Sequence, residues 1–149
     1  MRTLISLLVF SFLFASISTA QQDSFAYGQP SDLKGLKKVY VETGPDLKSH
    51  DAIIHGLAES KIEFEIVDDE KAAEIILTFT AEAVRGPIVN GDQRILQSGG
   101  GLVTATNIRG KDRVVLSFQD TRKNVFQHQP VTNFVHEFLK AYKKANGIK

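Results

Sequence analysis

Apolar and polar residues alternate along several stretches of the chain, a pattern that is typical of strands with one buried face. The clearest of these stretches are 33–42, 61–69, 74–84 and 113–120. Glycines interrupt a further predicted strand at 95–108, and 125–129 completes the set as a last short strand. The chain therefore supplies enough alternating segments to build one sheet.

Two segments carry the 3.6-residue period of a helix with one apolar side. The first is predicted at about 50–60, with Ser49 as its N-cap, and Gly56 is expected to let that helix pack closely. The second is predicted at 130–147, where Pro130 suits the first turn and Gly147 the C-terminal cap. Its apolar positions are Val131, Phe134, Val135, Phe138, Leu139 and Tyr142.

Glycine, proline and charged residues separate these elements. They predict turns at 43–46, 109–112 and 121–124, a single helical turn or a tight connection at 68–74, and a loop at 85–93. The element order is β-α-β-β-β-(β)-α. We therefore predict the α+β class, with a single small mixed sheet and two helices packed on one face. The first strand-helix-strand unit is expected to pair its two strands in parallel.

Residues 1–20 have the features of a cleavable signal peptide. Arg2 supplies the basic start, the apolar stretch runs from Leu4 to Phe14, and small residues precede a cut between Ala20 and Gln21. An uncleaved membrane anchor is the alternative, but a span needs about 20 apolar residues. Residues 21–32 are then expected to be a flexible leader, and 33–147 a single α+β domain.

Composition narrows the classes of partner. Arg2 is one of 18 basic residues, so cleavage leaves a formally neutral chain of 17 basic and 17 acidic residues. Such a chain lacks the net positive charge of nucleic-acid-binding proteins, and no second stretch is long enough to span a membrane. With no cysteine, disulfides, thiolate catalysis and lipid attachment at cysteine are excluded.

No catalytic constellation stands out. The four histidines are His50, His55, His128 and His136. The first two are five positions apart, so they do not share a helix face as metal ligands at i and i+4 would, and no third ligand is evident. The acidic run 68–70 fits a solvated turn that caps the next helical turn better than a carboxylate pair or a Ca²⁺ loop. We assign no catalytic, metal or cofactor-binding residue and expect no cofactor.

The triple glycine 99–101 lacks the helix that follows a phosphate-binding loop, so a bulge or a mobile hairpin loop is predicted there instead. The segment 85–101, which holds five of the eleven glycines, is the first choice for a binding loop. The strand patterns also predict a polar, open sheet face, formed by Thr78, Thr80, Glu82, Thr104 and Thr106.

Three phrases resemble small exported bacterial proteins of unknown function that have an envelope domain like the N-terminal domain of TolB. They are LKGLKKVYVE (33–42), VDDEKAAEIILTFTAE (67–82) and VTNFVHEFLKAYKKA (131–145). The resemblance extends over about 33–146 and implies a small sheet with two helices. Many members of that group are lipoproteins, whereas this chain lacks the lipid-bearing cysteine. The resemblance transfers no functional residues.

The sequence therefore predicts a general class of function and no specific activity. We expect a non-catalytic periplasmic or secreted binding or assembly module, whose partner is an envelope or secreted protein rather than a nucleic acid. A small secreted hydrolase, with a site assembled from residues distant in sequence, is the alternative. A structural domain of a larger envelope complex is a third hypothesis.

Overall fold

The computed structural model describes residues 26–89, 92–108, 110–120 and 130–149. The predicted signal peptide 1–20, the turn 121–124 and the strand 125–129 lie outside these residues. The described part of the expected leader forms strand β1 (Ala26–Tyr27) and the 3₁₀ helix η1 (Pro30–Leu33). The structured part of the chain thus begins before residue 33.

One six-stranded mixed sheet organises the molecule, and the predicted α+β class is confirmed. Its spatial order is β1-β6-β5-β4-β2-β3. The bounds of the remaining strands are β2 (Lys38–Glu42), β3 (Glu65–Ile66), β4 (Ile75–Val89), β5 (Asp92–Ile108) and β6 (Lys111–Asp120). The pairs β4–β5 and β5–β6 are antiparallel, whereas β2 is parallel to both β3 and β4, and β1 is parallel to β6.

The predicted strand-helix-strand unit is confirmed: β2, helix α1 (Leu47–Glu59) and β3 follow one another, and β2 and β3 pair in parallel. The second strand is much shorter than the predicted 61–69. The prediction that Ser49 is the N-cap is wrong, because Asp46 caps the helix. The Asp46 carboxylate accepts hydrogen bonds from the Ser49 amide at 3.1 Å and the Ser49 hydroxyl at 2.6 Å, so Ser49 lies inside the first turn.

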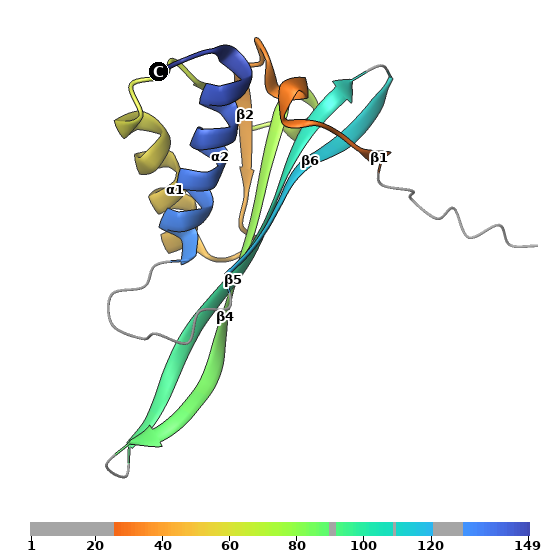
Figure 1. Cartoon of the computed structure of the whole chain (residues 1–149). Coiled ribbons are helices and arrows are strands. Elements are labelled where there is room, and N and C mark those ends of the chain that lie inside the picture. The colour runs from red at the N-terminus through yellow and green to blue at the C-terminus, as the bar shows by residue number, and fades with distance from the viewer. Residues whose placement is uncertain (1–25, 90–91, 109, 121–129) are drawn as a thin grey trace, which may run out of the picture.

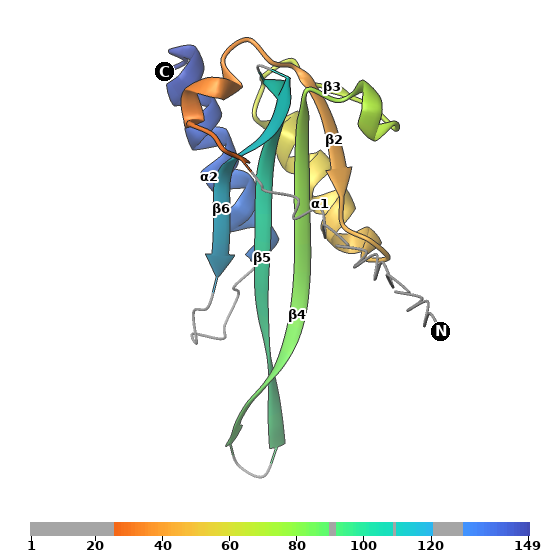
Figure 2. The same ribbon diagram turned by 90° about the vertical axis from the view of Figure 1, so that its right-hand side faces the viewer.

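Both helices cover the same face of the sheet, as Figures 1 and 2 show. Helix α2 (Pro130–Asn146) matches the predicted 130–147 closely, and Gly147 follows it with a φ of 66°. Phe134 and Phe138 are fully buried: the ring of Phe134 packs on those of Phe79 in β4 and Phe118 in β6, and the ring of Phe138 packs on that of Phe64. The two helices pack tightly because Gly56 has no Cβ: such an atom would lie 2.9 Å from a methyl carbon of Val135.

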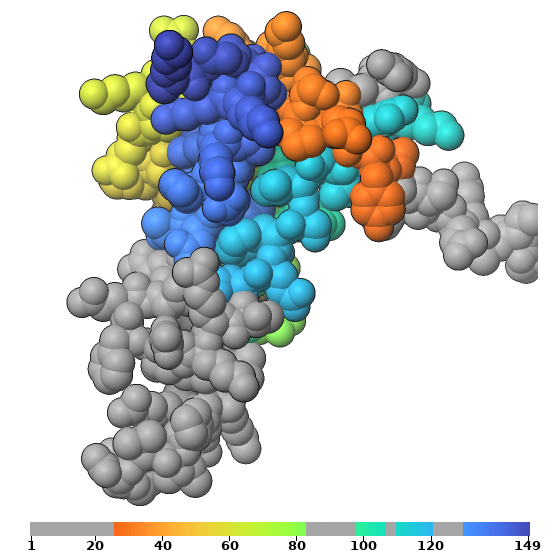
Figure 3. Space-filling model, in the orientation of Figure 1, coloured from red at the N-terminus to blue at the C-terminus, as the bar shows by residue number. Residues whose placement is uncertain are grey.

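The chain before β2 is attached to α2 (Figure 3). The Tyr142 hydroxyl donates to the Leu36 carbonyl at 2.7 Å, and the Gly35 amide donates to the Asn146 side chain at 2.8 Å. Burial raises the pKa of Tyr142, and the nearby Glu74 charge raises it further. These contacts close the end of the core where β2 begins.

The triple glycine 99–101 is neither a bulge nor a hairpin loop, so that prediction is wrong. All three glycines pair in register with both β4 and β6. A Cβ on Gly99 would lie 2.5 Å from the Phe79 ring, and one on Gly101 would lie 2.5 Å from the Phe134 ring. Glycine is required at these two positions because aromatic rings of the core rest directly on the β5 backbone.

The predicted loop 85–93 is also wrong. Strands β4 and β5 run through most of it, with a register shift between Arg85 and Ile88 that accommodates the glycine and proline between them. Beyond the pair Gly99↔Asp120, β4 is the one described strand that pairs with β5. The two strands therefore form a ribbon, here called the arm (83–89 and 92–97), that extends past the helices (Figures 1 and 2).

Candidate binding face

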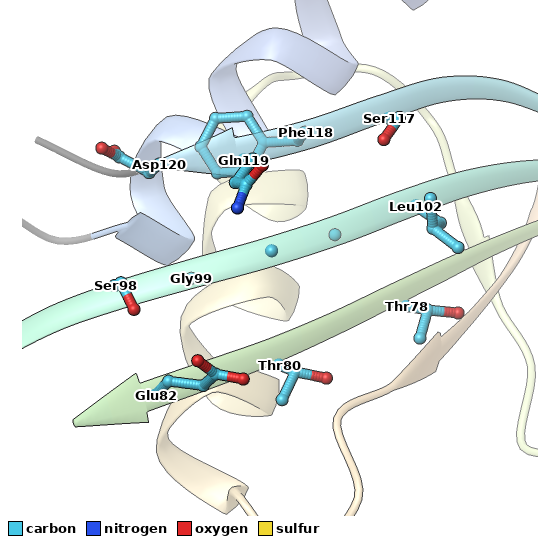
Figure 4. Close-up of a pocket in the computed structure, with 12 residues that line it drawn as sticks. Thr78, Thr80, Glu82, Ser98, Gly99, Leu102, Ser117, Phe118, Gln119 and Asp120 are labelled. Carbon is cyan, nitrogen blue, oxygen red and sulfur yellow. The ribbon is translucent and has the colours of Figure 1, made fainter. Parts of the chain in front are cut away.

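The face of β4, β5 and β6 opposite the two helices is the candidate site, here called the open face. It carries polar side chains because alternate residues of each strand point away from the helical layer. Figure 4 shows them along three neighbouring strands, except for Thr104, which lies two residues beyond Leu102 in β5. The residues are Thr78, Thr80 and Glu82 of β4, Ser98, Leu102 and Thr104 of β5, and Ser117 and Gln119 of β6.

Most of these residues border a shallow hollow of about 380 Å³. Gly100 supplies its floor, since it has no side chain and the nearest atom to an added Cβ would be 3.7 Å away. Leu102 is a half-buried apolar side chain beside the hollow, and farther along the face Thr104 lies between the apolar Ile76 and Val114. The open face therefore offers hydroxyl and amide groups around a small apolar centre, which suits the surface of another macromolecule.

The structure brings together four of the five residues predicted for this face. Thr106 lies apart, because its hydroxyl donates to the Ala73 carbonyl at 2.6 Å near the other end of β5. Ser117 and Gln119 were not predicted. The alternation that places Leu116 and Phe118 toward the helices already implied that these two polar residues would face outward.

Carboxylates on this side of the sheet have separate roles. Glu82 is exposed at the edge of the hollow. Glu42, whose register partner is Thr78, accepts a hydrogen bond from the Tyr40 hydroxyl at 3.0 Å and another from the Gly44 amide. The hydrogen bond to Glu42, with its negative charge, raises the pKa of Tyr40. Glu42 thus fixes the turn after β2.

Glu74 and Asp46, two described carboxylates with lowered pKa values, support the fold. Hydrogen bonds from the backbone amides of Lys37 and Lys38 lower the pKa of Glu74, and bonds from Ser49 lower the pKa of Asp46. Glu74 joins the start of β4 to the start of β2, at N–O distances of 2.7 and 3.0 Å. Each carboxylate is therefore committed to local backbone geometry.

The three described histidines lie on the helices, away from the open face. His50 and His55 belong to α1 and His136 to α2, while His128 lies outside the described residues. His55 and His136 border one shallow groove between the helices, and Glu59 lies 3.5 Å from His55. Across the described ranges, no group of three potential metal ligands comes together.

The acidic run 68–70 has the predicted structural role. Asp69 accepts a hydrogen bond from the Lys71 amide at 3.0 Å and caps the 3₁₀ helix η2 (Glu70–Ala72), which confirms the predicted single turn. Among the residues whose placement is described, no helix is long and apolar enough to span a membrane. The hydrolase alternative stays a prediction.

Comparison with known proteins adds little to this picture. No family model matches the chain, and no curated protein matches it. One similar solved structure is a minor lipoprotein from Acinetobacter baumannii, with 10% identity and a TM-score of 0.39 over 74% of this chain and 93% of that one. Another is an uncharacterized lipoprotein B from Nitrosomonas europaea, with 16% identity and a TM-score of 0.35 over 79% and 82%. The resemblance to the TolB N-terminal domain stays a prediction.

Proposed function

We propose that this protein is an exported, non-catalytic binding or assembly module that contacts its partner through the open face. The observation that carries the proposal is the position of both helices on one side of the sheet, while no described helix or loop covers β4, β5 and β6 on the other. A sheet face that the described part of the chain leaves uncovered is available to a second protein without rearrangement of the core.

The chemistry of the open face favours a protein partner. Threonine, serine and glutamine side chains both donate and accept hydrogen bonds, and Leu102 gives the contact an apolar centre. The balanced charge expected after cleavage removes any general attraction to nucleic acid. The predicted signal peptide places the encounter in the periplasm or outside the cell.

Site-specific photocrosslinking in cells that produce the full chain tests this proposal. Benzoylphenylalanine at Thr80 or Thr104 is expected to give a defined adduct with an envelope or secreted protein. The same group at Lys140 or Glu63 serves as the control, because Lys140 is exposed on α2 and Glu63 in the turn before β3. Adducts of equal yield from all four positions, or none from Thr80 and Thr104, would contradict the proposal.

A substitution on the open face tests whether the crosslinked protein binds there or is merely nearby. Thr104→Arg puts a long charged side chain beside the hollow and is expected to remove the adduct formed at Thr80. Lys140→Glu, on the opposite side of the molecule, is its matched control and is expected to leave that adduct unchanged. If Thr104→Arg has no effect although the protein is folded, the open face is not the contact surface.

A further inference from the structure

Strand β4 has a backbone edge that no described strand covers. Strand β2 pairs with it only from Val39↔Ile75 to Glu42↔Thr78, and then the chain turns away into α1. From Phe79 onward β4 keeps β5 on one side, while no described strand lies on the other. No described strand pairs with the N–H and C=O groups that point to this side, so they are available to an added strand.

A second hollow adjoins the same edge, on the helical side of the sheet. Its volume is about 320 Å³, and it lies where the first turns of α1 and α2 approach β4. Ala81 lies in its wall and is exposed, whereas Phe79 is buried. The lining residues are Asp46, Lys48, Ser49, Ala52, Phe79, Ala81, Pro130 and Val131. Most of the hollow is apolar, and it is distinct from the hollow of the open face.

We infer that an extended segment of the partner protein adds as a strand to β4 from Phe79 past Glu82, in the line that β2 leaves vacant. This inference rests on the proposed function and specifies its binding mode. Main-chain hydrogen bonds to the β4 edge would supply affinity, and alternate side chains would supply specificity, as in other cases of strand addition.

The surroundings of the edge define the chemistry of this segment. Side chains on the helical side enter the apolar hollow, so they are aliphatic, as Val39 and Val41 of β2 are on the same side. Side chains on the open side meet the exposed carboxylate of Glu82, which favours lysine or arginine because opposite charges stabilise cross-strand pairs. The expected segment therefore alternates aliphatic and basic or polar residues.

A second copy of this chain fits the described edge less well. If two copies of the chain paired through their β4 edges, Phe79 and Ala81 of each copy would face the hollow of the other. Phe79 is only 1% exposed and packs on Phe134 of its own core, and the Ala81 methyl group is too small to fill the space. A strand from a different protein can supply the larger aliphatic side chain that the hollow lacks.

Peptide binding to the full chain tests the inference. The probe is a fluorescein-labelled heptapeptide of alternating valine and lysine, measured by fluorescence anisotropy. Two further peptides carry N-methyl groups, one on the valines and the other on the lysines. Because successive N–H groups of a strand point to opposite edges, only one methylated peptide blocks the bonds to β4. We expect one to bind at least tenfold more weakly and the other to bind like the unmodified peptide.

Equal affinity of all three peptides, or no saturable binding, would overturn the inference. A matched pair of variants locates the site. Ala81→Phe fills the hollow at the edge and is expected to weaken peptide binding at least tenfold, whereas His136→Phe in the groove between the helices leaves it unchanged. Near-ultraviolet circular dichroism verifies that both variants keep their tertiary packing.

The failure of this inference can be distinguished from the failure of the proposed function. If Thr104→Arg removes the crosslink at Thr80 but Ala81→Phe does not, the open face binds the partner without strand addition. If neither variant changes the crosslink, both proposals are wrong. A dimer seen by analytical ultracentrifugation and abolished by Ala81→Phe would show that a second copy, not a different protein, occupies the edge.

Discussion

At the scale of single residues, Gly100 and Gly101 show opposite consequences of an added methyl group. A Cβ on Gly101 would lie 2.5 Å from the Phe134 ring, so Gly101→Ala forces that buried ring to move and is expected to cost about 1–3 kcal/mol. A Cβ on Gly100 would meet its nearest atom at 3.7 Å, so Gly100→Ala is expected to be neutral or stabilising by up to about 1 kcal/mol.

Urea unfolding measures the stability of both glycine variants, and a change of midpoint reports a change of stability as long as the m-value stays the same. The difference between them is the diagnostic quantity, because the two residues are adjacent in the same strand. If Gly101→Ala and Gly100→Ala had equal midpoints, Phe134 would not rest on the β5 backbone as the structure has it.

Glu74 makes stability depend on pH in a defined direction. Its pKa in the folded protein lies below the ordinary value of 4.5, because the amides of Lys37 and Lys38 bond its charged form. The unfolded chain therefore takes up the proton first as pH falls. The stabilisation is fully present above about pH 5 and is lost as pH falls through the lowered pKa.

Glu74→Gln removes this charge while it keeps the size of the side chain. It is expected to lower the urea midpoint at pH 7 and to lower it less at pH 3, because the stabilisation by the charged form of Glu74 fades as pH falls below the ordinary pKa of the unfolded chain. Glu63→Gln, at an exposed carboxylate, is the matched control. An equal loss from Glu74→Gln at both pH values would show that the charge of Glu74 does not contribute.

At the scale of elements, α2 holds the helical layer on the sheet. Phe138 is fully buried, and its ring centroid lies 5.8 Å from that of Phe64 and 5.9 Å from that of Tyr142. Phe138→Ala is expected to destabilise the fold by about 3–5 kcal/mol and to unfold at a distinctly lower denaturant concentration. Lys140→Ala, on the exposed side of the same helix, is expected to leave the midpoint nearly unchanged.

The elements with a single dominant period were predictable from the sequence. The stripe Phe134-Phe138-Tyr142 located α2, and the alternation Ile75-Leu77-Phe79 located the first half of β4. The predicted N-cap Ser49 is wrong because Asp46, three residues earlier, caps the helix by accepting a hydrogen bond from the Ser49 amide. Serine and aspartate are both common N-caps, so the sequence alone does not show which of the two begins the helix.

The arm could not be predicted because its strands depend on long-range pairing. Gly86 and Pro87 are turn residues by local preference, and only the register with β5 makes this stretch a strand with an irregularity. The triple glycine was misjudged for the same reason, since the rings above Gly99 and Gly101 come from β4 and α2. For the candidate site, the polar residues of β4 were predicted, but the bare β4 edge depends on where β2 ends.

At the scale of the whole molecule, the body and the arm are separable. The last described contact of β6 with β5 is Gly99↔Asp120, and beyond it the arm pairs only with itself. Glu82 and Ser98 are register partners, so an Asn-Gly turn can join them in place of residues 83–97. We expect this deletion to leave the urea midpoint of the body nearly unchanged.

The same deletion removes most of the free β4 edge while it keeps Thr80, Thr104 and the body of the sheet. The valine-lysine peptide is therefore expected to bind at least tenfold more weakly, because only Phe79 to Glu82 remain to pair with it. A second deletion, which joins Val84 directly to its register partner Leu96, keeps two more residues of β4 edge and is expected to bind with intermediate affinity. Peptide affinity that did not change with arm length would place the added strand elsewhere on the sheet.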